Sequence, residues 1–513
     1  DKIIFPAKQV QQGFEQFLGR SVTQATIRPQ GLFQPSILKS GKTKNDCKKD
    51  IINLYNLPSN AKIIANVAYA DHRKGFDFFV TACMQVMQVI PNAYAIWIGH
   101  QDTALVESCM ALVTDEKIRS RFILTNCYVN NPQDYYAAAD VFALTSREDP
   151  FPSVVLESLD ALTPIIAFED CGGFENLLKR GCGVLVKKGD VTAYGNAIKS
   201  LLANPDKAKR LAETGKEIVE TELSFRHYLY DLLELSNIPL PRISVVVPNY
   251  NYANYIESRL ASITLQTFPI YELIVLDDHS TDNSKDIIQN FLQTCDIPHR
   301  FTINTKNSGS VFKQWEKGIA LSRGDYIWIA EADDLSNAQF LEKLMPYFND
   351  PEVILAYSQS KQIDQDDNLL TDNYLNYTND IGNYWDDDYI IDGKEEIRRA
   401  LCIKNTIPNV SGVVFKREEL SSSFNNIKHE IKKYKVAGDW LIYIELAKNG
   451  KIAYSSTSNN LHRRHAISVT KKNNHMSEIV AVQALCRDIV QLPQAVENII
   501  HDYNQKLEQH FGS

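Results

Sequence analysis

The sequence predicts an α/β protein with two Rossmann-like domains. Two separate stretches of the chain carry the same pattern, in which short apolar runs alternate with helical segments. Such alternation is typical of a parallel sheet covered by helices on both faces. In the first stretch the apolar runs are 63–67, 94–98, 121–124, 141–144, 164–168 and 183–186, and the first helix is 76–89.

The second alternation begins at Ile243 and fades beyond about Asn349. Its expected strands begin at Ile243, Glu272, Phe301 and Ile327, and its expected helices are 255–264 and 311–322. Pro239 and Pro241 stiffen the junction between the two stretches, so we expect docked domains. The predicted segments are 1–35, the Rossmann lobe 36–235, a linker 236–242, the second α/β domain 243–475 and a helical tail 476–513.

Composition restricts the classes of function. The chain has 513 residues and a formal net charge of -9, which argues against a nucleic-acid partner bound through a basic surface. Its nine cysteines form no Cys-x-x-Cys pair, and no signal peptide or membrane-spanning apolar run is visible. We therefore expect a cytoplasmic protein with reduced thiols. Because the chain starts at Asp1, we expect sequence upstream of it.

Two cations and a helix start lie beyond the strands of the first domain, where ligands of such sheets bind. Arg73 and Lys74 precede one predicted helix, and Ser153 and Val154 begin another. Free backbone N–H groups at a helix start bind phosphate, and Glu157, one turn further, suits ribose hydroxyls. Each feature alone also fits a plain role, such as a solvated charge pair. Together they predict a nucleotide site.

Three carboxylates in four positions form the strongest site signal. Glu331, Asp333 and Asp334 follow the buried apolar run 327–330. Carboxylate oxygens suit hard ions such as Mg²⁺ or Mn²⁺, which bridge proteins to substrate phosphates. The alternative is a strand that ends in a solvated acidic turn. Further along, Arg463, Arg464 and His465 suit a flap over a diphosphate, with His465 as a metal ligand, or else a basic surface patch.

Three motifs of the second domain carry a family resemblance. They are Val-Val-Val-Pro-Asn-Tyr-Asn at 245–251, Leu-Asp-Asp-His-Ser-Thr-Asp at 276–282 and Glu-Ala-Asp-Asp at 331–334. In type, order and spacing they closely resemble glycosyltransferase family 2, which has the GT-A fold. The resemblance implies a nucleotide-sugar donor and a divalent metal on its diphosphate. Glu331 departs from the family, which usually has Asp there.

The resemblance assigns roles to individual residues. Its nucleotide-sugar contacts would be Pro248, Asn249, Asp277, Asp278, Asp333, Arg463 and Arg464. Its Mn²⁺ or Mg²⁺ ligands would be Glu331, Asp333, Asp334 and His465. Asp439 matches the general base of the inverting family, although Gly438 replaces the usual preceding Glu. The alternative role for Asp439 is a helix-start carboxylate that satisfies backbone donors.

The first domain resembles a different family. Arg73-Lys74-Gly75, followed later by Ser-Arg-Glu-Asp-Pro-Phe-Pro-Ser-Val-Val-Leu-Glu, looks like the nucleotide-sugar lobe of glycosyltransferase family 4, a retaining family with the GT-B fold. By that match Arg73 and Lys74 meet the diphosphate, Asp149 the sugar and Glu157 the ribose. Residues 1–35 resemble only the end of the preceding acceptor lobe, so the GT-B lobe is incomplete, and we expect it to bind nucleotide sugar weakly or not at all.

The leading hypothesis is an inverting, metal-dependent glycosyltransferase. It would move a sugar from a nucleotide sugar to a glycan or lipid-linked glycan in bacterial capsule or O-antigen synthesis, with the tail 476–513 docked on the domain or bound peripherally to the inner face of the plasma membrane. Two alternatives remain open. One is a bifunctional polymerase with a second, retaining site completed upstream of Asp1. The other is a non-catalytic nucleotide-sugar-binding scaffold.

Overall fold

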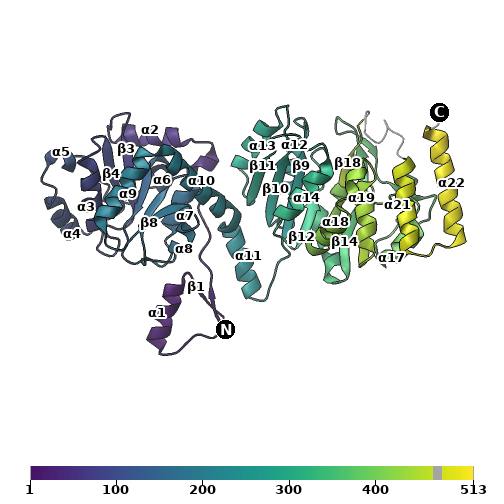
Figure 1. Cartoon of the computed structure of the whole chain (residues 1–513), viewed down its shortest axis with the longest axis horizontal. Coiled ribbons are helices and arrows are strands. Elements are labelled where there is room, and N and C mark those ends of the chain that lie inside the picture. The colour runs from purple at the N-terminus through teal and green to yellow at the C-terminus, as the bar shows by residue number, and fades with distance from the viewer. Residues whose placement is uncertain (1, 466–475, 512–513) are drawn as a thin grey trace. The chain divides into compact units, whose positions relative to one another are not determined.

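The chain folds into two compact units, Asp1–Leu240 and Pro241–Ser513 (Figure 1). The computed structural model describes residues 2–465 and 476–511. The end of the predicted second domain, 466–475, and the last two positions of the predicted tail therefore lie outside the described residues. Each unit has its own sheet and its own hydrophobic core, and each is described separately.

The first unit is built on a six-stranded parallel sheet in the order β5-β4-β3-β6-β7-β8. Its strands are β3 (Lys62–Val67), β4 (Ala93–Ile98), β5 (Phe122–Leu124), β6 (Val141–Leu144), β7 (Ile165–Phe168) and β8 (Gly183–Val186). The chain runs outward from β3 to β5 and then returns to β6, so the order reverses between β3 and β6. Ligands of doubly wound sheets bind at such a switch point.

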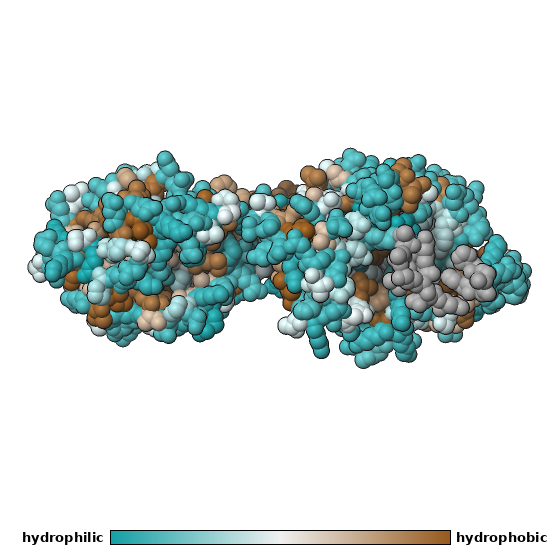
Figure 2. All heavy atoms as spheres, turned by 90° about the horizontal axis from the view of Figure 1, so that it is seen from above, coloured by the Kyte–Doolittle hydropathy of each residue, from teal (hydrophilic) through white to brown (hydrophobic). Residues whose placement is uncertain are grey.

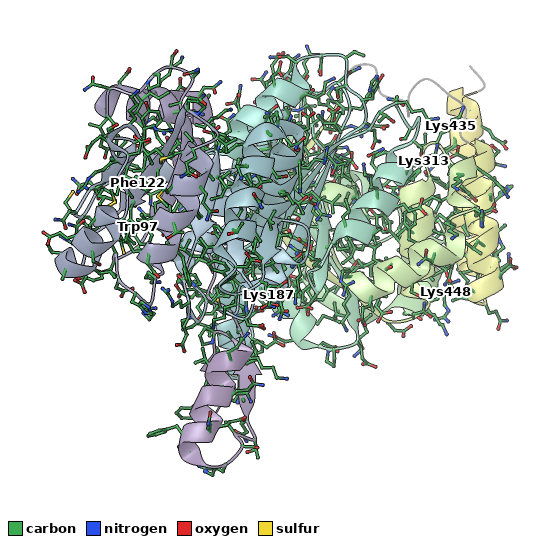
Figure 3. The ribbon with its side chains drawn as sticks, turned by 60° about the vertical axis from the view of Figure 1, so that its left-hand side comes forward. Trp97, Phe122, Lys187, Lys313, Lys435 and Lys448 are labelled. Atoms are coloured by element: carbon green, nitrogen blue, oxygen red, sulfur yellow. The ribbon has the colours of Figure 1, made fainter. Side chains whose placement is uncertain are left out.

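Helices cover this sheet. They are α2 (Lys44–Leu54), α3 (Phe76–Met87), α4 (Thr103–Ala111), α5 (Glu116–Arg119), α6 (Pro132–Ala138), α7 (Ser153–Asp160), α8 (Glu175–Leu178), α9 (Val191–Ala203), α10 (Pro205–Glu222) and α11 (Phe225–Leu235). Trp97 of β4, labelled in Figure 3, is buried with its ring edge-on to Phe76 and Phe79 of α3. These contacts fix α3 on the sheet, and with it the loop that precedes α3.

A short βαβ element precedes this sheet. It consists of β1 (Ile3–Phe5), α1 (Lys8–Leu18) and β2 (Ala25–Ile27), and its two strands pair in parallel. The 3-10 turn η1 (Ile37–Ser40) follows. Arg28 forms an ion pair with Asp231 of α11, with Nε 2.6 Å from Oδ2. The segment after β2 is thereby tied to the last helix of the same unit.

The second unit contains a ten-stranded mixed sheet. Its main order is β11-β10-β9-β12-β17-β14-β18-β13, with β15 beside β14 and β16 beside β18. Its strands are β9 (Ile243–Asn249), β10 (Glu272–Asp277), β11 (His299–Ile303), β12 (Tyr326–Ile329), β13 (Leu335–Ser336), β14 (Val353–Ile363), β15 (Leu369–Thr371), β16 (Tyr389–Asp392), β17 (Val413–Lys416) and β18 (Lys451–Arg463). The strands β9 to β12 are parallel, so their carboxyl ends share one edge.

Two cores lie on the two faces of this sheet. On β9, Val246 belongs to one core while Val245 and Val247 belong to the other, as the two-residue period of a strand requires. The α-helices are α12 (Ile256–Thr264), α13 (Ser284–Gln293), α14 (Val311–Leu321), α15 (Phe340–Leu344), α16 (Leu375–Thr378), α17 (Gly393–Glu396), α18 (Arg417–Ile427), α19 (Gly438–Ala447), α21 (Met476–Ile489) and α22 (Gln494–Phe511). The short helical turns are η2 (Met345–Asn349), η3 (Ile397–Leu401), η4 (Val410–Gly412) and η5 (Ile431–Lys433).

The predicted fold class is confirmed. The observed strands of the first unit differ from the predicted runs by one residue or less at each end. Beyond Asn349, where the alternation was expected to fade, β14 and β18 are the two longest strands of the unit and pair along most of their length. Both strands contain many polar residues, unlike the mainly apolar runs of β9, β10 and β12, and register shifts interrupt their pairing.

The surface is largely hydrophilic, and most of the cysteines lie inside the protein. Figure 2 shows hydrophilic residues over most of the visible face, with apolar residues in scattered patches. All nine cysteines are thiols, and eight of them are buried. Within 2–465 and 476–511, no helix has both the length and the apolar character needed to cross a bilayer.

Candidate active site

The carboxyl ends of β9 and β10 are joined by side-chain hydrogen bonds. Asn249 Nδ2 donates to Asp277 Oδ2 over 2.8 Å, and the backbone N–H of Ser280 donates to Asp277 Oδ1 over 2.8 Å. Asp277 is fully buried, and both of its oxygens are used inside the protein. The structure therefore places Asp277 beneath the loop, where it positions Asn249, and not against a cavity.

The neighbouring Asp278 lines a cavity of about 610 Å³. Asn304 Nδ2 donates to Asp278 Oδ1 over 2.6 Å, and Ser308 donates to Asp278 through its N–H and its hydroxyl. This smaller cavity is also lined by Pro248 and Asn249. Three of the four nucleotide contacts predicted in the first two loops, Pro248, Asn249 and Asp278, thus line one cavity. The fourth, Asp277, holds Asn249 in place from below.

Glu331 lines the smaller cavity from β12's end, where Trp315 of α14 holds its carboxylate. Trp315 Nε1 donates to Glu331 Oε1 over 2.8 Å. Burial, and then the negative charge of Asp333, raise the pKa of Glu331 to about 8. Trp315 is buried and also positions an acidic side chain of the cavity.

Asp333 and Asp334 point to different partners. Asp333 lines a second, larger cavity of about 910 Å³, and its Oδ2 lies 2.8 Å from His465 Nε2. Asp334 is buried and accepts hydrogen bonds from the Arg463 N–H over 2.8 Å and from Asn409 Nδ2 over 2.7 Å. Burial and the charge of Asp333 raise the pKa of Asp334 to about 7. Asp334 therefore anchors β18 and the segment around Asn409.

Arg463 also has internal partners. Its Nε donates to the Asp333 carbonyl over 2.6 Å, its Nη1 donates to the Asp364 carbonyl over 2.6 Å, and its Nη2 pairs with Asp367. Its side chain is almost fully buried. Arg463 thus supports the acidic loop from within and also lines the larger cavity, together with Arg464 and His465, which are more exposed.

A buried cation lies beneath the acidic loop. Arg259 of α12 is fully buried, and its guanidinium carbon lies 4.9 Å from the centre of the Trp328 ring. Burial lowers the pKa of Arg259 to about 10, while the three acidic residues of the loop act in the opposite direction. Arg259 balances part of the loop's charge. A single Arg inside an amphipathic helix gave no sequence signal for this role.

The four predicted metal ligands are not gathered around one point. Among residues 2–465 and 476–511, no group of three or more His, Cys, Asp or Glu side chains is arranged to hold an ion. Asp333 and His465 do form an adjacent oxygen and nitrogen pair on the larger cavity. Such a pair suits an ion that takes its other ligands from a diphosphate and water. Glu331 and Asp334 would then support this pair from the surrounding structure without contacting the ion.

Asp439 stands at the start of α19 and lines both cavities. Asn405 Nδ2 donates to its Oδ2 over 3.1 Å, and the Trp440 N–H donates to its Oδ1 over 2.7 Å. Burial raises the pKa of Asp439 to about 6. A carboxyl group with that pKa is ionised at neutral pH yet is a stronger base than an ordinary aspartate.

Gly438 precedes Asp439 because Phe312 occupies the space beside it. A Cβ atom at Gly438 would lie 2.3 Å from Cζ of Phe312, whose ring lines the smaller cavity. A glutamate therefore does not fit at this position unless the ring moves. At position 438, where the resemblance leads one to expect Glu, the ring of Phe312 fills the space that the side chain would need.

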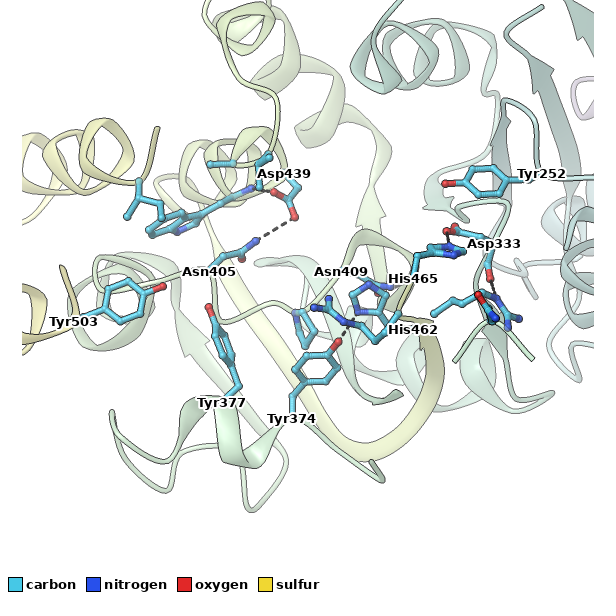
Figure 4. Close-up of a pocket in the computed structure, with 18 residues that line it drawn as sticks. Tyr252, Asp333, Tyr374, Tyr377, Asn405, Asn409, Asp439, His462, His465 and Tyr503 are labelled. Carbon is cyan, nitrogen blue, oxygen red and sulfur yellow. Dashed lines mark hydrogen bonds and ion pairs between the residues drawn. The ribbon is translucent and has the colours of Figure 1, made fainter. Parts of the chain in front are cut away.

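The two cavities adjoin. Tyr252, Asn409, Val436 and Asp439 line both of them. Figure 4 shows Asp439 with Asn405 on one side of the larger cavity and Asp333 with His465 and Tyr252 on the other. A substrate that spans the cavities would thus have a base on one side and a carboxylate and imidazole pair on the other.

The predicted site of the first unit has its charges paired. Lys74 forms an ion pair with Asp149, and Arg73 Nη1 donates to the Glu148 carbonyl over 3.3 Å. Ser153 is exposed at the start of α7, while Val154 and Glu157 are half-buried. These residues share the carboxyl edge of the sheet, but the ammonium group of Lys74 already has a carboxylate partner.

The glycine of the Arg-Lys-Gly motif has a steric cause. Gly75 has φ of +73°, and a Cβ atom there would lie 2.0 Å from the Thr145 carbonyl oxygen. Only glycine allows the loop before α3 to approach the end of β6 so closely. This approach brings Lys74 next to Asp149.

Comparison with known proteins finds a family match in each unit. The "Glycosyl transferase family 2" model matches residues 244–420, and the "Glycosyl transferases group 1" model matches residues 48–218. The two units are called the family 2 domain and the group 1 domain below, after the models that match them. This order confirms the two resemblances that the sequence motifs predicted.

Curated relatives carry related names. The chain is 29% identical over 170 residues to "Glycosyltransferase GlyG" of Streptococcus pneumoniae serotype 4, covering 33% of this chain and 50% of that relative. It is 25% identical over 214 residues to "Putative teichuronic acid biosynthesis glycosyltransferase TuaG" of Bacillus subtilis, covering 42% and 75%. The chain thus spans half the length of the first and three quarters of the second. The crystal structure of S. aureus TarS 1-349 aligns at 16% identity and a TM-score of 0.39, covering 53% of this chain and 72% of that chain.

Several residues of the family 2 domain were not singled out from the sequence. They are Tyr252, Arg259, Asn405 and Asn409 around the acidic loop and the base, and Glu478 and Tyr503 from the helical tail. No local pattern marks them, because their roles depend on contacts between segments far apart in sequence.

Proposed function

We propose that the family 2 domain catalyses inverting transfer of a sugar from a nucleotide sugar to a glycan acceptor. The observation that carries this proposal is the place of Asp439. Its carboxylate lines both cavities, its pKa is raised to about 6 by burial, and it faces Asp333 and His465 across the larger cavity. Inversion requires a base and a stabilised leaving group on opposite sides of the reacting sugar.

The smaller cavity is the proposed site of the nucleoside. Pro248, Asn249 and Asp278 line it, and the Asn304 and Ser308 bonds fix the Asp278 carboxylate. Arg464 and His465 would then meet the diphosphate at the larger cavity. Without a metal, the bond to Asp333 raises the pKa of His465. A metal bound to this pair would displace that proton, because only a neutral imidazole can be a ligand.

In the proposed reaction Asp439 accepts the proton of the acceptor hydroxyl. The freed oxygen lone pair forms a bond to the anomeric carbon, while the bond from that carbon to the diphosphate oxygen breaks. Asn405 holds Asp439 in place through its bond to Oδ2. Asp333 and His465 would hold Mn²⁺ or Mg²⁺, which when bound supplies positive charge to the departing nucleoside diphosphate.

The proposed setting is bacterial surface-polysaccharide synthesis at the cytoplasmic side of the membrane. The name of the relative TuaG refers to teichuronic acid biosynthesis, which is the chemistry of a cell-surface polymer. The acceptor would be a glycan or a lipid-linked glycan. The group 1 domain, whose Lys74 is paired with Asp149, is proposed not to transfer sugar by itself.

The test is nucleotide release by the full chain across a panel of nucleotide sugars with Mn²⁺ or Mg²⁺. We expect release with at least one donor, with loss in Asp439→Asn and Asp333→Ala. Full activity in EDTA would contradict the proposed metal. Unchanged activity in Asp439→Asn would contradict the proposed base, and binding of a nucleotide sugar with no release by any donor would favour a non-catalytic scaffold.

A further inference from the structure

The two helices of the tail contribute side chains to the larger cavity. Ile479 of α21 and Tyr503 of α22 both line it. Figure 4 shows Tyr503 and Tyr377 close to Asn405 and Asp439, at the end of the cavity away from Asp333. The tail, which the sequence suggested as a docking or membrane-binding segment, therefore forms part of the cavity wall on the side of the base.

Buried polar contacts fix the position of α22. Gln483 of α21 is buried, and its amide exchanges two hydrogen bonds with Asn504, of 3.0 Å and 2.8 Å. Gln483 Nε2 also donates to the Ile403 carbonyl over 2.9 Å. Arg487 pairs with Glu497 through two further bonds. Because Asn504 follows Tyr503 directly, this pairing sets the depth at which Tyr503 enters the cavity.

A buried lysine joins Tyr503 to Tyr377. The Lys404 ammonium lies 4.4 Å from the centre of the Tyr377 ring and 5.4 Å from that of Tyr503. It also pairs with Asp380 over 2.6 Å, and its side chain is only 3% exposed. A cation shared by two rings holds both in place. The two tyrosines therefore form a fixed aromatic pair, although they come from segments more than a hundred residues apart.

The tail also holds the segment that leads to the base. Glu478 of α21 accepts backbone hydrogen bonds from Lys435, Val436 and Ala437, of 2.9, 3.0 and 3.0 Å. These three residues directly precede Gly438 and Asp439. One carboxylate on the tail thus satisfies three N–H groups at the entrance of α19, and this ties the position of α21 to that of the base.

We propose that Tyr377 and Tyr503 form the binding platform for a pyranose ring of the acceptor, so that the tail completes the acceptor site. This inference rests on the proposed function. A pyranose presents an apolar C–H face and a rim of hydroxyls, and tyrosine offers an apolar ring with a polar tip. A ring seated on this pair lies beside Asp439, which must reach one acceptor hydroxyl. Glu478 is a positioning residue for Asp439.

The test uses the full chain with methyl pyranosides of glucose, galactose and N-acetylglucosamine as acceptor probes. We expect Tyr503→Ala to raise the acceptor KM by about tenfold, which corresponds to about 1.4 kcal/mol of lost contact with the ring. Donor KM and the rate of nucleotide release to water should stay within about twofold of wild type, because neither needs the platform. Tyr503→Phe should keep most of the acceptor binding, since it retains the ring.

Two further variants separate positioning from binding. Gln505→Ala, an exposed position on the same helix, should leave every parameter unchanged. Glu478→Gln should lower kcat for both transfer and release to water without changing the acceptor KM. If Tyr503→Ala loosens α22, its melting temperature falls, and Tyr503→Leu, which keeps the apolar volume but not the aromatic face, replaces it in the comparison.

The outcomes are distinguishable. Equal acceptor KM values in wild type, Tyr503→Ala and Tyr503→Leu overturn the platform, and so does the absence of pyranoside binding by saturation-transfer NMR at millimolar concentration in a protein that releases nucleotide. No nucleotide release by wild type with any donor overturns the proposed function instead. In that case NMR binding of the pyranosides, lost in Tyr503→Ala, still supports the platform.

Discussion

Each domain places its candidate ligand residues at the carboxyl ends of its own parallel strands, but the charged side chains have different surroundings in the two domains. In the group 1 domain Lys74 pairs with Asp149, and Arg147 pairs with Asp77 through two bonds. In the family 2 domain burial raises the pKa of Asp439 to about 6. Burial also raises the pKa values of Glu331 and Asp334. Charge that is left under electrostatic strain is a mark of functional sites, whereas paired charge is compatible with a purely structural role.

The largest effect that would test this contrast is expected at the base. Asp439→Asn should lower the transfer rate by about 10³-fold, since general base catalysis contributes at that scale. The same change should raise the free energy of unfolding at pH 8 by about 1–3 kcal/mol, because a carboxyl group whose pKa is raised by folding destabilises the protein once it is ionised. Kinetics and chemical denaturation measure the two. A stability gain that persists at pH 4, where the carboxyl group is protonated, would contradict the electrostatic cause.

Asp333→Ala should lower the transfer rate by about 10²-fold, the scale of losing one group that stabilises leaving-group charge. It should also raise the Mn²⁺ concentration needed for half-maximal activity. Asp387→Ala, which removes an exposed carboxylate of the same domain, is the matched control. Equal metal dependence in both variants would show that Asp333 does not hold the ion.

The pH profile tests the raised pKa of Asp439. Below about pH 6 the carboxyl group takes up a proton and cannot accept one from the acceptor. We expect kcat/KM to fall by about tenfold per pH unit on this acidic side. The residual activity of Asp439→Asn should lack this limb. A wild-type midpoint near pH 4 would mean that the carboxyl group is not desolvated in the working enzyme.

A smaller effect is expected at the indole that supports Glu331. Trp315→Phe keeps the buried ring but removes the hydrogen bond to Oε1. We expect about a fivefold loss of kcat/KM, the scale of one hydrogen bond of about 1 kcal/mol. Kinetics with varied donor measure it. Trp97→Phe, in the core of the other domain, serves as the control for loss of a buried indole.

The smallest effects are expected in the group 1 domain. Lys74→Ala and Glu157→Ala should change the transfer rate by less than about twofold, because both residues belong to a separate compact unit with its own core. A large loss in either variant would break the comparison, since it would place a working nucleotide site in the first domain. Nucleotide-sugar titration by calorimetry of the Asp439→Asn variant would then count the sites.

The parallel strands were predictable because each is a short apolar run bounded by turn residues, so its identity depends on local sequence. The loops after β9, β10 and β12 were also predictable, since their motifs are continuous. The strands β14 and β18 were not, because residues of both are partly polar and find partners across the sheet. Within the loops, sequence could not tell that Asp277 and Asp334 turn inward while Asp278 and Asp333 face the cavities.

Residues outside the motifs were beyond sequence reasoning for another reason. Arg259, Glu478 and Tyr503 act through contacts with segments that lie tens to hundreds of positions away. The replacement at Gly438 was visible, but its cause was not, because Phe312 lies on a different helix. The spacing of residues along the chain identifies the side chains that one loop contributes to a site. It does not identify the side chains that a distant helix contributes.

The bonds from Glu478 to the segment before Asp439 have a consequence for how the protein is made. A chain emerging from the ribosome releases the strands β9 to β18 before it releases α21 and α22, and folding proceeds in that order. Until α21 docks, three backbone N–H groups beside the base lack the carboxylate that satisfies them in the finished protein. We expect a nascent or prematurely terminated chain to carry a nucleotide pocket without a competent base. The proposed transfer activity would thus appear only after translation has passed α22.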